Sequence, residues 1–245
     1  MSYQGASVLV TGGSRGIGRE VALRFADEGA SRVAVGYLRN DRAAEAVAGE
    51  LRERGAESIL VRGNVSSTRV ADEVAALGRL DALVHSAATG VIRPALETED
   101  KHWDWTLNAN ARALLSLARV VVPAMQNGAA IVAISSLGSV RVLENYALVG
   151  TSKAALESVV RYLAVELAPQ GIRVNAVSGG IVDTEALDHF PNREQMLHDA
   201  RSRTPAGRMV EASDLADAVL FLCGPHSKMI CGQTIVVDGG FSLPA

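Results

Sequence analysis

Short runs of apolar residues alternate along the chain with longer segments in which apolar residues recur at helical spacing. Most of the short runs are rich in valine and isoleucine and alternate little with polar residues, which is typical of strands buried on both faces. The predicted strands cover residues 7–10, 33–37, 58–61, 82–85, 130–134, 173–177 and 234–237. The predicted helices include residues 17–28, 42–54, 103–125, 152–168 and 215–222. This alternation indicates an α/β fold, a doubly wound, seven-stranded parallel sheet with helices on both faces.

The domain organisation follows from what the pattern lacks. There is no internal repeat, low-complexity tract or Pro/Gly/Ser-rich linker, so residues 1–245 are predicted to form a single domain. The least regular stretch, residues 183–209, lies between the sixth strand and the last helix and contains Pro191, Pro205 and Gly207. An excursion at this position is typical of a lid over a site. A solvated surface insertion would have a similar composition.

Composition and charge narrow the function classes. The net charge is −3 with no long run of one sign, which gives no indication of nucleic acid or an anionic membrane as a partner. No apolar stretch reaches the ~18 residues that span a bilayer, and the first strand begins too early for a signal peptide. Cys223 and Cys231 form neither a disulfide scaffold nor a metal-ligand motif. We therefore expect a cytoplasmic protein without a metal site.

A glycine-rich turn joins the first strand to the first helix and reads Thr11-Gly12-Gly13-Ser14-Arg15-Gly16-Ile17-Gly18. Its glycines allow a tight turn and a close backbone approach, and they leave free N–H groups at the positive end of the helix dipole. Because the turn follows a strand and opens a helix, it predicts a site for the pyrophosphate of a dinucleotide cofactor.

The end of the second strand bears on which dinucleotide binds. An NAD-preferring protein usually places an acidic residue there to bind the adenosine ribose. This strand ends in Tyr37-Leu38-Arg39-Asn40, without a carboxylate, and Asp41 comes later. Arg39 offers a planar fork to a 2′-phosphate, and Arg15 is a second candidate. The sequence therefore favours NADPH.

A candidate catalytic group follows the fifth strand. Ser136 precedes Lys153 by seventeen residues, and the phenol nearest to the lysine is Tyr146. Seven residues is almost two helical turns, so Tyr146 and Lys153 can share one helix face. A nearby ammonium favours the phenolate and would lower the tyrosine pKa.

These motifs resemble the short-chain dehydrogenases/reductases over essentially the whole chain, from residues 11–18 to residues 232–240, GQTIVVDGG. The resemblance implies a Rossmann-type NADP-binding domain, a strand order of 3-2-1-4-5-6-7 and a homotetramer with the C-terminal segment in an interface. It implies catalytic roles for Asn110, Ser136, Tyr146 and Lys153, with Lys153 also on the nicotinamide ribose. The further cofactor contacts that it implies are Asn64 and Val65 at the adenine, Ala87 beside the cofactor, and Ile181 and Thr184 at the nicotinamide. Residues 85–88, HSAA, depart from the family's usual Asn-Asn-Ala-Gly.

The tyrosine also departs from the common family pattern Tyr-x-x-x-Lys. Val149 stands four residues before Lys153, and Tyr146 makes the spacing Tyr-x6-Lys. This spacing is similar to that of the enoyl-acyl-carrier-protein reductases. Further segments resemble the NADPH-dependent type III enzymes: 102–106 (HWDWT), 135–141 (SSLGSVR), 143–146 (LENY), 178–180 (SGG) and 189–194 (HFPNRE).

The chemistry agrees with a displaced phenol. In conjugate reduction of an enoyl thioester, hydride adds to C3 while negative charge develops on the C1 oxygen. The acid must then lie about two bonds further from the nicotinamide than in ketone reduction, and roughly one helical turn supplies such a displacement.

The sequence therefore predicts an NADPH-dependent reductase of trans-2-enoyl thioesters, carried by acyl carrier protein or CoA. A β-ketoacyl-[acyl-carrier-protein] reductase on the same scaffold is the main alternative, and a non-catalytic NADPH-binding sensor is a lesser one. Four arginines could receive a pantetheine phosphate or an acidic carrier protein, or could form an ordinary charged helix face: Arg193, Arg201, Arg203 and Arg208.

Overall fold

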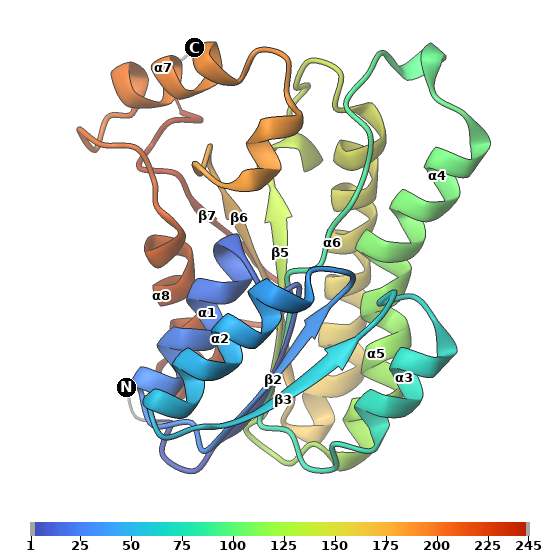
Figure 1. Ribbon diagram of the computed structural model, residues 1–245, viewed down its shortest axis with the longest axis vertical. Helices are drawn as coiled ribbons and strands as arrows, with labels where there is room; N and C mark the ends of the chain where they lie inside the picture. The colour runs from blue at the N-terminus through green and yellow to red at the C-terminus, as the bar shows by residue number, and fades with distance from the viewer. Residues whose placement is uncertain (1–2, 244–245) are drawn as a thin grey trace.

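A single parallel sheet organises the chain. In the computed structural model, which describes residues 3–243, seven strands pair in the order β3-β2-β1-β4-β5-β6-β7 (Figure 1). The strands are β1 (Ser7–Thr11), β2 (Arg32–Tyr37), β3 (Glu57–Arg62), β4 (Ala82–His85), β5 (Ala130–Ser136), β6 (Arg173–Gly179) and β7 (Thr234–Val237). The predicted fold class and the strand order implied by the family resemblance are confirmed.

Helices cover both faces of the sheet. They are α1 (Gly16–Asp27), α2 (Asp41–Glu53), α3 (Thr68–Ala75), α4 (Asp100–Leu107), α5 (Ala113–Val121), α6 (Ala147–Leu167), α7 (Arg193–Arg203) and α8 (Ala212–Cys223). Successive residues of β1 point to opposite faces, as the pleat of a strand requires. Val8 and Val10 therefore pack in the apolar cluster with residues of α1, α2 and α8. Leu9 packs in the cluster with residues of α3, α5 and α6.

The predicted helix over residues 103–125 is not one regular helix. A π-helical turn, Asn108–Arg112, joins α4 to α5, and a 3-10 turn, Val122–Ala124, follows α5. A π turn carries one extra residue per turn and often occurs at a functional position. Asn110 lies in this turn and is buried.

The strand order reverses beside β1, which pairs with β2 on one side and with β4 on the other. Ligands of doubly wound sheets bind outside the carboxyl ends of the strands at such a switch point. Residues 183–209 lie beyond the carboxyl ends of β5 and β6 at the top of Figure 1. They contain a 3-10 helix, Glu185–His189, and α7.

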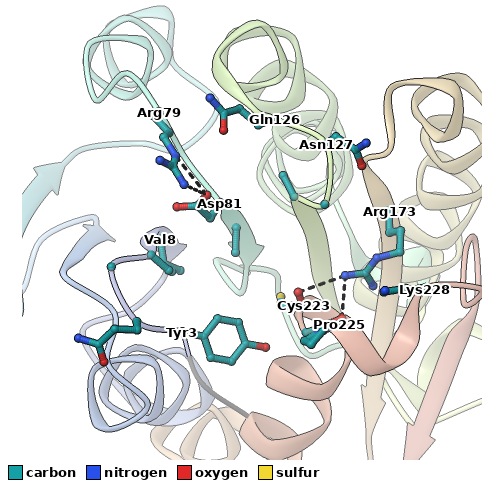
Figure 2. A pocket seen from close by; sticks show the side chains of 17 residues that line it. Tyr3, Val8, Arg79, Asp81, Gln126, Asn127, Arg173, Cys223, Pro225 and Lys228 are labelled. Carbon is teal, nitrogen blue, oxygen red and sulfur yellow. Dashed lines mark hydrogen bonds and ion pairs between the residues drawn. The ribbon is translucent and has the colours of Figure 1, made fainter.

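At the amino ends of the strands, opposite the switch point, a buried arginine links β6 to α8. Arg173, at the start of β6, is buried and donates to the Leu222 carbonyl. It also donates to the carbonyls of Cys223 and Gly224 at the end of α8 (Figure 2). A cation at this position complements the negative end of the helix dipole. Burial raises the pKa of the neighbouring Cys223 thiol to about 12, so the thiol is unreactive at neutral pH. A cavity of about 380 Å³ opens beside these groups, and none of the predicted catalytic or cofactor residues lines it.

The described residues contain neither a membrane-spanning helix nor a metal-ligand cluster. No helix within residues 3–243 is long and apolar enough to cross a bilayer. In the same range, no group of three or more His, Cys, Asp or Glu side chains is arranged to hold a metal ion.

Candidate active site

The turn after β1 has the geometry of a phosphate cradle. Gly12 has a φ of +67°, and a Cβ there would stand 2.8 Å from the Cα of Ala87. A Cβ on Gly18 would stand 2.3 Å from the Gly12 carbonyl oxygen, so only glycine lets α1 begin this close to the turn. Arg15 is the N-cap of α1 and no side chain caps the helix. The first-turn N–H groups of α1 therefore suit a pyrophosphate, and these residues fit a dinucleotide cofactor.

The segment after β6 reaches the same turn. The Arg15 guanidinium forms an ion pair of 2.7 Å with Glu185. The Cγ2 of Thr184 would lie 3.5 Å from a Cβ built on Gly16. The structure thus brings Thr184 to the phosphate turn, whereas the family resemblance implies a contact at the nicotinamide for this residue. It also gives Arg15 a carboxylate partner that the sequence did not predict.

The carboxyl ends of β2 and β3 form the far end of the site. Arg39 follows β2, is exposed and has no side-chain partner among residues 3–243. Arg62, which sequence reasoning missed, lies opposite Tyr37 in the β2–β3 register. Asp41 accepts a hydrogen bond of 2.9 Å from the Tyr37 hydroxyl and lies 3.3 Å from Arg62. The only signal for Arg62 in the sequence is its place at the end of a strand adjacent to the second one.

The remaining predicted cofactor residues occupy the same edge. Asn64 follows β3, and its Oδ1 accepts hydrogen bonds from the backbone N–H and hydroxyl of Ser66. Ala87 donates its N–H to the Thr11 hydroxyl at 3.2 Å. The other three positions are partly exposed: Ser14, Val65 and Ile181. Ile17 is also partly buried and packs against the cluster around α1.

Tyr146 lies at the N-cap of α6, just before the helix rather than on it. Its hydroxyl donates to the Ser136 Oγ at 3.4 Å, a long contact, and its ring lies 5.8 Å from that of Phe190. A Cβ on Gly138 would stand 2.5 Å from the tyrosine ring, so the glycine after Ser136-Leu137 makes room for the phenol. Asn145, with a φ of +59°, makes the turn that places Tyr146 there.

The protonation state of Tyr146 differs from the prediction. We expected the Lys153 ammonium to lower the tyrosine pKa. In the structure, burial raises the pKa of Tyr146, and the hydrogen bond to Ser136 offsets only part of this effect. The side chain is therefore a neutral phenol at neutral pH, the form that can donate a proton or a hydrogen bond.

Val149 occupies the position of the family's common tyrosine. It is buried on the first turn of α6, and its Cγ2 would stand 2.3 Å from a Cβ built on Gly90. The loop after β4 therefore packs directly on Val149. Because valine has no hydroxyl, the phenol beside Ser136 is that of Tyr146, about one turn earlier.

Lys153 is buried beneath the site. Its Nζ donates to the Ile134 carbonyl of β5 at 2.7 Å. Burial lowers the pKa of Lys153 to about 8, although the Glu157 carboxylate acts in the opposite direction. The side chain is mainly an ammonium at neutral pH and loses its proton as the pH rises through this value.

A hydrogen-bond network holds Asn110 in the π turn. The Asn110 side chain accepts from the Thr89 N–H at 2.8 Å, and its Nδ2 donates to the Thr89 carbonyl and to the Ser152 hydroxyl. His85 lies between the Thr11 hydroxyl, 3.0 Å from its Nδ1, and the Asn110 carbonyl, 3.2 Å from its Nε2. Burial lowers the pKa of His85 to about 4, so the ring is neutral.

These partners assign the tautomer of His85. The Asn110 carbonyl can only accept, so Nε2 carries the proton, and Nδ1 accepts from Thr11. The histidine that departs from the family pattern therefore links β1 and β4 to the π turn.

The arrangement places a neutral phenol, a buried ammonium and a dinucleotide cradle along one edge of the sheet. A family model described as enoyl-(acyl carrier protein) reductase matches residues 12–242. The chain belongs to the short-chain dehydrogenase/reductase family. It is therefore an oxidoreductase that uses a nicotinamide cofactor, and this prediction is confirmed.

Similar proteins of known name include reductases of two kinds of acyl thioester. The 1-cyclohexenylcarbonyl-CoA reductase of Streptomyces collinus is 42% identical, over 97% of this chain and 87% of that protein. The 3-oxoacyl-[acyl-carrier-protein] reductase FabG of Staphylococcus aureus (strain N315) is 35% identical, over 97% of this chain and 98% of that protein. A short-chain dehydrogenase from Burkholderia cenocepacia J2315, solved in complex with NADP, superposes with a TM-score of 0.88 at 32% identity, over 98% of this chain and 99% of that one.

Proposed function

We propose that this chain is a cytoplasmic, NADPH-dependent reductase of trans-2-enoyl thioesters. The observation that carries the proposal is the displacement of the phenol by about one turn, from the usual position in α6 to the N-cap of that helix. Val149 fills the usual tyrosine position against Gly90, and the half-buried phenol of Tyr146 lies one turn earlier beside Ser136. An acid displaced in this way matches a substrate whose oxygen lies two bonds further from the hydride-accepting carbon than the oxygen of a ketone does.

The roles of the side chains follow from their positions. The bound nicotinamide supplies the hydride. The Tyr146 phenol donates a hydrogen bond to the thioester oxygen, which becomes negative as hydride adds to C3 of the substrate. The resulting enolate then takes up a proton at C2 from water. Lys153 holds the nicotinamide ribose and places a positive charge near this oxygen. Ser136 and Asn110 orient the surrounding groups.

Reduction of a β-ketoacyl thioester is the second candidate. The FabG relative supports it, because that protein is named as a 3-oxoacyl-[acyl-carrier-protein] reductase. A ketone that binds deeper or shallower in the site would also meet the displaced phenol. A non-catalytic NADPH sensor is the lesser alternative, and it would bind NADPH without turning over either substrate.

A direct comparison of substrates tests this choice. NADPH oxidation at 340 nm is followed with crotonyl-CoA and acetoacetyl-CoA in parallel. We expect kcat/KM to be larger for the crotonyl thioester. A larger value for acetoacetyl-CoA would make the chain a ketoreductase with a displaced tyrosine. Turnover of neither substrate, with NADPH binding retained, would support the sensor.

The carrier is proposed to be CoA or acyl carrier protein. The Streptomyces relative supports CoA, because that protein is named as a reductase of a CoA substrate. Two of the four arginines that could bind the carrier already have carboxylate partners. Arg193 pairs with Asp183, Asp188 and Glu194 of its own chain. Arg208 pairs with Asp214. Arg201 and Arg203 of α7 remain for this role.

We propose NADPH rather than NADH as the cofactor. Asp41, the acid closest to the end of β2 in the sequence, is engaged by Tyr37 and Arg62, while Arg39 has no side-chain partner among residues 3–243. An unpaired guanidinium at this strand end, beside an acid that is already paired, suits a 2′-phosphate.

Arg39→Ala tests the cofactor assignment. Loss of a charge-assisted contact costs about 1.5–3 kcal/mol, so the preference for NADPH over NADH is expected to fall about 10–100-fold. The ratio of kcat/KM for the two cofactors measures it, with Arg42→Ala, an exposed arginine of α2, as the control. An unchanged ratio would move 2′-phosphate recognition to Arg15 or Arg62.

Two further proposals concern assembly and access. The exposed apolar side chains Phe221, Val236 and Leu243, near the C-terminus, support the expected homotetramer. The contacts of Glu185 with Arg15 and of Phe190 with Tyr146 support a lid role for residues 183–209.

A further inference from the structure

A buried carboxylate lies beside the site and has no part in the proposed reaction. Glu157 lies one turn after Lys153 on α6 and is only 7% exposed. Its Oε1 accepts a short hydrogen bond from the hydroxyl of Ser135, itself buried at the end of β5. The Lys153 ammonium donates to the carbonyl of Ile134, the residue before Ser135. Two opposite charges are thus tied to adjacent residues of one strand.

A carboxylate is rarely buried without a compensating charge, because removing it from water costs several kcal/mol. The hydroxyl of Ser135 satisfies only part of its hydrogen-bonding capacity. The compensating charge is that of Lys153, four residues away on the same helix face. No direct ion pair between the two is present within the described chain, so their attraction acts through the poorly screened interior.

The other groups around Lys153 carry no charge at neutral pH. His85 on β4 is neutral because its pKa is about 4, and Tyr146 at the N-cap of α6 is a neutral phenol. Ser136 on β5 and Asn110 in the π turn are uncharged polar groups. Glu157 is therefore the anion that acts on the lysine, and it is the charged group that raises the lysine pKa against burial.

We propose that Glu157, held by Ser135, is a positioning residue that keeps the Lys153 side chain in its ammonium form inside the protein. The inference rests on the proposed function only in that Lys153 serves cofactor binding and reduction. It does not depend on which thioester is reduced.

It follows that Glu157 sets the upper limit of the pH range in which Lys153 is an ammonium. Burial alone favours the neutral amine, and the Glu157 carboxylate opposes this effect. Without the carboxylate, the pKa of Lys153 falls below about 8 and the ammonium is lost at lower pH. NADPH binding and kcat/KM, which need the ammonium, should therefore decline at a lower pH without the carboxylate. At acidic pH, where the lysine is protonated in either case, both should stay close to their wild-type values.

Glu157→Gln in the full chain tests the proposal. The Kd for NADPH is measured by fluorescence from pH 6 to 9.5, without acyl substrate, and kcat/KM is measured over the same range. We expect the midpoint of the alkaline decline to move down by about one pH unit or more, and values near pH 6 to stay within about threefold of wild type. Because binding is read without a thioester, a wrong substrate assignment does not affect the result.

Three variants provide comparisons. Glu157→Asp keeps the charge and should restore much of the wild-type midpoint. Ser135→Ala should shift it in the same direction by less, and it tests the proposal even if Glu157→Gln fails to fold. Glu166→Gln changes an exposed glutamate of the same helix and should shift nothing. An unchanged midpoint in both Glu157→Gln and Ser135→Ala, or a loss equal at every pH, would overturn the proposal.

Discussion

Tyr146→Phe is expected to lower kcat by about 10²–10³-fold while the Kd for NADPH changes by less than about twofold. The substitution removes the hydroxyl that would donate to the thioester oxygen and keeps the ring, which packs against Gly138 and Phe190. Steady-state kinetics with crotonyl-CoA and fluorescence titration of NADPH measure the two effects.

The chain offers a matched control for this substitution. Tyr162 lies on α6, the helix that follows Tyr146, and is 71% exposed, so Tyr162→Phe should leave both quantities unchanged. Wild-type turnover in Tyr146→Phe would remove this phenol from the reaction and leave the displaced-tyrosine spacing without a chemical meaning.

Lys153→Ala is expected to weaken both binding and chemistry. Loss of the ammonium would remove the proposed charge-assisted contact to the ribose, worth about 10–100-fold in NADPH affinity. It would also remove the proposed positive charge near the developing oxyanion, worth about 10²–10³-fold in kcat. The wild-type rate should also decline as the pH rises through about 8, because the ammonium of Lys153 is then lost.

The thermal midpoint separates this role from a structural one. Burying an ammonium costs free energy, and methionine keeps the apolar stem of the side chain. Lys153→Met should therefore retain most of the thermal stability while kcat falls. NADPH affinity and kcat both unchanged in Lys153→Ala would refute the double role of the lysine.

Local patterns were sufficient to predict the frame of the molecule. The valine- and isoleucine-rich runs all became strands, because a strand buried on both faces has few alternative residue types. The glycine turn was also predictable, since the φ of Gly12 and the close approach of Gly18 to it leave no room for a side chain. Tyr146 and Ser136 were predicted together from their spacing to Lys153 and from the family resemblance, and their side chains are in contact.

The properties that depend on neighbours distant in sequence were not predictable. The role of His85 arises only when Thr11 and Asn110 are brought to its two ring nitrogens. The π turn at Asn110 follows from tertiary hydrogen bonds to Thr89 and Ser152, so the helical spacing did not reveal it. The predicted lowering of the Tyr146 pKa was wrong, because the spacing between a tyrosine and a lysine carries no information about the desolvation of the phenol.

The arginines of the 183–209 segment show the same limitation. Their sequence is compatible with a carrier-binding face, yet Arg193 and Arg208 are neutralised by acids of the same segment and of α8. Charge counts along a chain do not reveal which charges pair with one another after folding.

The site of hydride addition tests the central claim most directly. NADPH deuterated at the transferred position is incubated with crotonyl-CoA and the enzyme, and the product thioester is analysed by NMR. Conjugate reduction predicts butyryl-CoA with one deuterium at C3. Absence of this product, with deuterium instead at the carbinol carbon of 3-hydroxybutyryl-CoA when acetoacetyl-CoA is supplied, would contradict it.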